Sequence, residues 1–124
     1  MTRCHLPKWM RHAKAASLVP AIAALLMLSR GAMAQSNWDY RSHQSGNWNS
    51  TTTWEYYYKG NWRTPATSTP TAASEIITIQ SGHTVTVTAA VTADQVVVET
   101  GGQVTVSSGV TLTIANGTGV DLDV

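Results

Sequence analysis

The feature that most constrains the fold is a series of short segments between residues 75 and 124 in which apolar and polar residues alternate. Two examples are Val104-Thr105-Val106 and Val110-Thr111-Leu112-Thr113-Ile114. Period-two alternation of β-branched residues predicts strands with one buried face. Turn-forming pairs such as Gly101-Gly102 separate the segments. The pattern predicts strands over residues 75–80, 83–88, 95–100, 103–107, 110–115 and 120–124.

The spacing of these strands narrows the architecture. Equivalent apolar residues recur every 8 to 11 positions, at Val85, Val96, Val104, Leu112 and Leu122. Such spacing fits either a β-sandwich or a β-solenoid. The inward residues are mid-sized aliphatics that stack well in register, and no aromatic residue follows Trp62 to fill a sandwich core. We therefore predict an all-β chain that begins a β-solenoid, with three strands per coil. A small antiparallel β-sandwich remains the alternative, because Asn116-Gly117 is a strong hairpin signal.

The first 34 residues have the organisation of a secretory signal peptide. Four basic residues lie within positions 1–14, an apolar run covers 15–28, and Ala32-Met33-Ala34 supplies the small residues of a cleavage site. The apolar run is shorter than the roughly 20 residues needed to span a bilayer. The sequence thus predicts cleavage after Ala34, a secreted or cell-surface product, and no membrane insertion after cleavage.

Removal of the leader changes the charge of the product. The whole chain has 8 basic and 7 acidic residues, but only Arg41, Lys59 and Arg63 lie beyond residue 34, together with all the acids. The product therefore has a net charge of −4 and lacks the basic surplus typical of nucleic-acid binders. The only cysteine, Cys4, is lost with the leader, so we expect no disulfide, no cysteine metal site and no cofactor.

Aromatic residues are confined to residues 35–63, and a Thr/Pro-rich linker, 64–74, separates this region from the strands. One interpretation is a cap, because the terminal repeat of a solenoid must cover its exposed core. Trp48 and Trp54 are then core anchors. Residues 54, 56 and 58 share one strand face, so the cap interpretation places Glu55 and Tyr57 outside.

The other interpretation is a carbohydrate-binding surface, in which ring faces stack on sugars and polar neighbours bond the sugar hydroxyls. Extracellular glycans are then the partners. The candidate residues are Trp48, Trp54, Tyr56, Tyr58 and Trp62.

Four sequence stretches carry a resemblance to a known group of proteins. They are Y-R-S-x-x-S-G-N-W-N-S-x-x-T-W at 40–54, I-T-I-x-S-G-H-T-V-T-V-T at 77–88, D-Q-V-V-V-E-x-G-G at 94–102 and S-S-G-V-T-L-T-I at 107–114. Together they resemble the N-terminal region of large secreted bacterial surface proteins, often exported by the type IX system, and more distantly the G8-type domain. The resemblance implies a right-handed parallel β-helix. It also implies that the pattern continues beyond Val124, so that further coils of the same protein are the partners of this segment.

No constellation of catalytic residues stands out, and we expect no enzymatic activity. Asp121 and Asp123 share a strand face, but they lack the repeat that makes a calcium site convincing, so we expect solvated side chains. His43 and His83 lack metal-ligand spacing, and a hydrogen bond beside a turn is expected for His83. The leading hypothesis is an exported structural or adhesive segment that caps and initiates a β-solenoid, and the alternative is a secreted carbohydrate-binding module.

Export of the chain from a bacterial host should yield a product that begins at Gln35, because the small residues at Ala32 and Ala34 fit the signal peptidase. Intact-mass spectrometry of the secreted protein measures this directly. A full-length chain retained in the membrane fraction would instead indicate an uncleaved anchor.

Overall fold

The computed structural model describes residues 34–124, of which residues 35–124 form one compact unit. The predicted leader, apart from Ala34, lies outside the described residues. The described chain is all-β, as predicted, with one short 3₁₀ helix (Thr51–Thr53). Its strands are β1 (Tyr40–Ser42), β2 (Gly46–Asn47), β3 (Trp54–Tyr58), β4 (Asn61–Arg63), β5 (Ile76–Ile79), β6 (Thr84–Val87), β7 (Val91–Ala93), β8 (Gln95–Val98), β9 (Gln103–Val106), β10 (Leu112–Ile114) and β11 (Leu122–Asp123).

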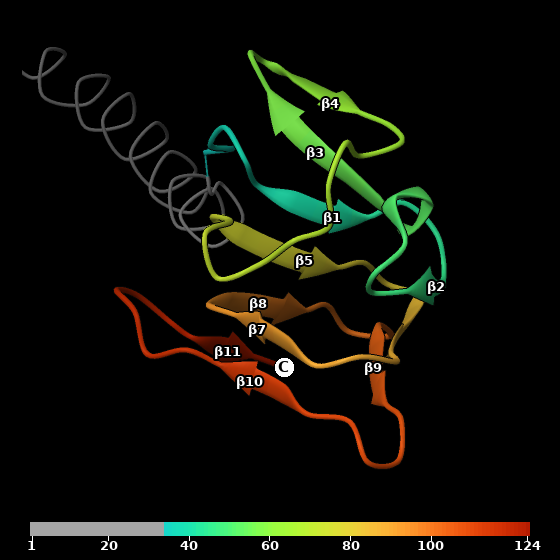
Figure 1. Cartoon of the computed structure of the whole chain (residues 1–124). Helices are drawn as coiled ribbons and strands as arrows, with labels where there is room; N and C mark the ends of the chain where they lie inside the picture. Colours follow the sequence, from blue (N-terminus) through green and yellow to red (C-terminus); the bar gives the residue numbers. More distant parts are fainter. Residues whose placement is uncertain (1–33) are drawn as a thin grey trace, which may run out of the picture. The chain divides into compact units, whose positions relative to one another are not determined.

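Three sets of strands pair in parallel. The first runs β1–β5–β8–β11, the second β2–β6–β9, and the third joins β7 to β10. Figure 1 shows the first set stacked from β1 down to β11. The register repeats, because Ile77 pairs with Val96 and Val85 with Val104, 19 residues apart in both cases. The chain therefore returns to an equivalent position in two different sheets after the same number of residues.

Two expectations need correction. The antiparallel sandwich is wrong, because every pairing among β5 to β11 is parallel. Asn116-Gly117 accordingly makes no hairpin: it connects β10 and β11, which belong to different sheets. Strand β7 was not predicted, since its three residues follow Ala89-Ala90 and are too few to establish a period.

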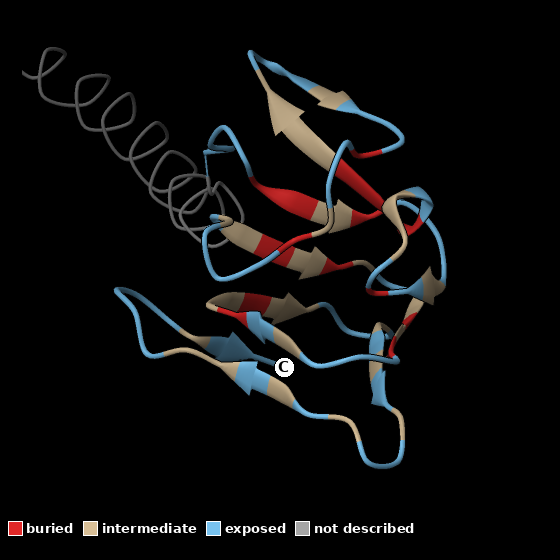
Figure 2. Ribbon diagram, in the orientation of Figure 1, coloured by how far each residue is buried: buried red, intermediate tan, exposed pale blue. Residues whose placement is uncertain are grey.

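Burial decreases along the parallel sets. In the row that faces the core, Tyr40, Ile77 and Val96 are buried, whereas Leu122 in β11 is 50% exposed. Figure 2 shows the same trend, with buried residues concentrated in β1, β3, β5 and β6 and exposed ones in β9 to β11. Each inward residue is thus covered by the next strand in its ladder, and the last strands have no such cover among the described residues.

An antiparallel hairpin extends the largest sheet beyond β1. Strand β3 pairs with β1, with Tyr56 opposite Tyr40, and β4 pairs with β3. Lys59 and Gly60 form the two-residue turn, with φ values of 50° and 82°, as type I′ hairpin turns require. The segment 64–74 is irregular, as its composition predicts, but it is not a free linker, because Ala66 and Pro70 are buried.

Replacement of Gly102 by alanine should lower the free energy of unfolding by about 1–3 kcal/mol. A Cβ atom there would lie 2.8 Å from the carbonyl oxygen of Ile79 and 3.1 Å from those of Gln80 and Glu99, and backbone atoms cannot move aside cheaply. Urea denaturation followed by circular dichroism measures the change. Ser108→Ala, in an exposed turn, is the control and should change the value by less than about 0.5 kcal/mol. Equal effects of the two substitutions would contradict the close packing of this turn.

Candidate functional site

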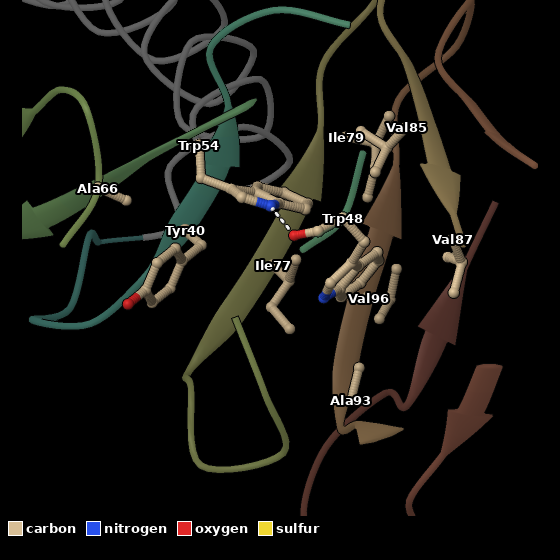
Figure 3. Packing of buried hydrophobic residues seen from close by; sticks show 10 residues of the cluster. All are labelled: Tyr40, Trp48, Trp54, Ala66, Ile77, Ile79, Val85, Val87, Ala93 and Val96. Atoms are coloured by element: carbon tan, nitrogen blue, oxygen red, sulfur yellow. Dashed lines mark hydrogen bonds between the residues drawn. The ribbon is translucent and has the colours of Figure 1, made fainter. Parts of the chain in front are cut away.

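Trp48 and Trp54 form the centre of the core. Both side chains are fully buried, and their rings meet edge to face with centroids 5.0 Å apart. The indole N–H of Trp54 donates to the carbonyl oxygen of Trp48 at 2.7 Å, as Figure 3 shows, and that of Trp48 donates to the carbonyl oxygen of Pro70 at 2.9 Å. Both buried donors are therefore satisfied, which large aromatic residues with a polar atom require in a core.

This position decides between the two interpretations for these residues. The prediction that Trp48 and Trp54 are core anchors is confirmed, since they belong to one cluster with Ile77, Ile79 and Val85. Their assignment to a carbohydrate-binding surface is wrong, because neither indole presents a face to solvent. The candidate surface is thereby reduced to Tyr56, Tyr58 and Trp62.

A second group of rings lies at the surface, formed by Trp38, Tyr56 and Tyr58, hereafter the ring cluster. Trp38 is 48% exposed and lies parallel to Tyr56, with centroids 5.9 Å apart and an interplanar angle of 9°. The ring of Tyr58 is 5.3 Å from Trp38 and 6.4 Å from Tyr56. The ring cluster is thus a continuous aromatic surface.

The backbone fixes Trp38 in an unusual conformation. Its φ of 74° lies in the left-handed region, which costs a non-glycine residue about 1 kcal/mol or more. Its N–H donates to the carbonyl of Tyr57 at 2.9 Å, and its own carbonyl accepts the N–H of Glu75 at 3.2 Å. These two bonds hold the residue between β3 and β5, with its ring against Tyr56.

Two cations adjoin the ring cluster. The Nζ atom of Lys59 lies 5.2 Å from the ring centroid of Tyr58, and the guanidinium carbon of Arg63 lies 5.7 Å from it. Both distances fall within the range of cation–π attraction. The N–H of Lys59 also donates to the side-chain oxygen of Asn37 at 2.9 Å, which ties the hairpin turn to the segment that carries Trp38.

The opposite face of the hairpin holds an ion pair between Arg41 and Glu55. Arg41 lies 4.0 Å above the ring of Trp62, which also meets Tyr57 edge to face at 5.3 Å. The prediction that Glu55 lies outside needs correction: it is on the face opposite Trp54, but its side chain is only 10% exposed. A buried carboxylate requires a partner, and Arg41 supplies it. Trp62 is therefore occupied by intramolecular contacts on this second face.

The remaining candidates are polar. His83 follows a turn, and its Nδ1 atom is hydrogen-bonded to the Ser42 hydroxyl at 2.8 Å, in agreement with the prediction for it. Asp121 accepts the N–H of Gly117 at 3.2 Å. Among residues 34–124 no group of three or more His, Cys, Asp or Glu side chains is placed to hold a metal ion. The described part of the chain also contains no helix long and apolar enough to cross a membrane.

Comparison of the chain with family models, curated proteins and solved structures finds no match to any of them. The arrangement of the site therefore has to be interpreted from its own geometry.

Sequence reasoning missed three members of the surface: Trp38, Lys59 and Arg63. Alternation alone places Tyr56 and Tyr58 on one face of β3, but Trp38 joins them only through the register between β1 and β3. No local pattern encodes that register. The two cations adjoin Tyr58 because the hairpin turn is two residues long, a length that Lys59-Gly60 could have suggested.

The two groups of rings should respond differently to truncation. Trp54→Ala should lower the free energy of unfolding by about 3–5 kcal/mol, because it leaves a large cavity in the core. Trp38→Ala should have a much smaller effect, because about half of that side chain already contacts solvent. Chemical denaturation of both variants tests the assignment, and a larger loss for Trp38→Ala would overturn it.

Proposed function

We propose that this chain is an exported structural or adhesive surface segment that caps and initiates a β-solenoid. The observation that carries the proposal is the set of parallel ladders with a common 19-residue register. A chain that returns to the same position in successive sheets can add further strands in the same way, without changing the fold of those already formed. The resemblance to secreted bacterial surface proteins is consistent with this role, and the role requires no catalytic residues.

The arrangement at the β1 end supports the capping part of the proposal. The β3–β4 hairpin continues the largest sheet in the antiparallel sense, so a further parallel strand cannot pair with β1. Trp48, Trp54 and Tyr40 supply the bulk that the aliphatic rows lack. An end closed by large aromatic residues suits a terminal repeat, whose core has no neighbour on one side.

The other end supports the initiating part. A hollow of about 330 Å³ is open beside β8 to β11 and is lined almost entirely by aliphatic side chains. They are Val96, Val98, Val104, Leu112, Ile114, Leu122 and Val124. These residues continue the inward rows that are buried in β5 and β6. We propose that the next parallel coil of the same protein covers this apolar end, as β8 and β9 cover β5 and β6.

Purified residues 35–124 should self-associate through this end, because apolar rows without a covering coil favour pairing with another copy. Sedimentation velocity should show association that is lost in the double variant Val106→Lys, Leu122→Lys, whose side chains lie on the inward rows and are partly exposed. The matched control is Thr105→Lys, Thr113→Lys, on the outward faces of β9 and β10. We expect the control to associate like the unmodified protein. A stable monomer with a cooperative transition above ~60 °C would contradict the proposal.

The ring cluster favours a second candidate function, carbohydrate binding. Three adjacent rings remain at the surface, and one of them, Trp38, is held there at a conformational cost. Such strain commonly accompanies functional sites. Tyr56 and Tyr58 from the original candidate set belong to this surface, and Trp62 lies on the opposite face of the hairpin. Calorimetric titration with a panel of polysaccharides tests the function, and loss of binding in Trp38→Ala without loss of fold would assign it to the ring cluster.

A further inference from the structure

We propose that the ring cluster, together with Lys59 and Arg63, binds acidic polysaccharides, whose sugars carry carboxylate or sulfate groups. This inference rests on the second candidate function, because it names the class of carbohydrate that the surface would take. It combines two features that lie side by side: an aromatic surface for sugar rings and a pair of cations for their acidic groups.

The aromatic part provides the stacking surface. One face of Trp38 lies against Tyr56 in a parallel arrangement, so its exposed area belongs to the other face and the ring edges. Tyr58 continues the surface at 43° to Trp38. Flat, exposed indole and phenol rings offer apolar faces for the C–H groups of a sugar, and their rigidity keeps the entropy cost of binding low.

The cationic part provides the preference for acid. Lys59 and Arg63 both lie within 6 Å of the centroid of Tyr58, and both are exposed. Neither forms an ion pair with another described residue, whereas the third cation, Arg41, is paired with Glu55. An acidic group bound beside Tyr58 would therefore gain two charge-assisted contacts and break no existing ion pair.

The distribution of charge fixes where a polyanion can bind. Beyond the leader the chain has seven acids and three basic residues, so most of its surface repels an anion. Four of the acids, Asp94, Glu99, Asp121 and Asp123, lie in or next to β8 and β11, at the opposite edge of the sheet from β4. Charge complementarity thus confines a polyanion to the hairpin.

Two acids adjoin the ring cluster along the chain. The carboxylate of Asp39 accepts the N–H groups of Ser36 at 2.8 Å and Ile76 at 3.0 Å, so it is committed within the fold. Glu75 is exposed, and its N–H donates to the carbonyl of Trp38. It is therefore the one acid next to Trp38 whose charge can oppose an anionic ligand, and its removal should strengthen binding.

The test uses two matched pairs of probes, titrated calorimetrically into residues 35–124. Dextran sulfate is compared with dextran, and polygalacturonate with its methyl ester, so each pair differs in its acidic groups alone. Duplex DNA serves as a polyanion without exposed sugar faces. The variants are Lys59→Gln with Arg63→Gln, Trp38→Ala and Glu75→Gln, with Glu99→Gln as the remote control. Circular dichroism verifies the fold of each variant.

We expect the acidic member of at least one pair to bind more tightly than its neutral partner, and to weaken in about 0.5 M NaCl, where charges are screened. The double glutamine variant should weaken that binding about five-fold, since exposed charge contacts contribute about 0.2–1 kcal/mol each. Trp38→Ala should abolish it, Glu75→Gln should strengthen it, and Glu99→Gln should leave it unchanged.

Other outcomes overturn the proposal in distinguishable ways. Equal binding of acidic and neutral members, insensitive to salt, would overturn the acidic class and leave carbohydrate binding intact. Binding of DNA as tight as that of the acidic polysaccharides would show a general polyanion site instead. No binding of any probe would overturn both the acidic class and the carbohydrate function.

Discussion

The indole N–H of Trp54 donates to the main-chain carbonyl of Trp48, and the indole N–H of Trp48 donates to that of Pro70. Without these bonds, each buried donor would cost about 1–3 kcal/mol. With them, two large rings fill the core between the first parallel strands and the irregular segment 64–74. Pro70 and Ala66 are consequently buried, so this segment belongs to the core although its composition is typical of a linker.

The antiparallel hairpin follows from the same arrangement. Trp54 begins β3, and once its side chain is buried, alternation directs Tyr56 and Tyr58 to the same face and Glu55 to the other. Along that face the rings pass from full burial at Trp54 to a surface cluster with Trp38. On the other face, Glu55 needs a cation, and the register places Arg41 directly opposite it. One anchored residue thereby determines what both faces of the hairpin present.

Much of the fold was predictable, because its strands obey a local rule. The alternation of β-branched residues located β5, β6, β8, β9, β10 and β11 and their buried faces. What depends on register was not predictable. The burial of Glu55 requires Arg41 from another strand, and the ring cluster requires Trp38 from the segment before β1. The same limit applies to Asn116-Gly117, whose hairpin preference is local, whereas the parallel partners of β10 and β11 are distant in sequence.

The two proposed roles make use of opposite edges of one sheet, in which β4 is the first strand and β11 the last. At the β4 edge the surface is aromatic and holds the two cations without an ion-pair partner; at the β11 edge it is aliphatic and acidic. A ligand at the first edge would leave the second free for pairing with further strands. A polyanion would also be repelled from the second edge by Asp121 and Asp123. Extension and binding are thus compatible in one molecule, and the charge distribution keeps them apart.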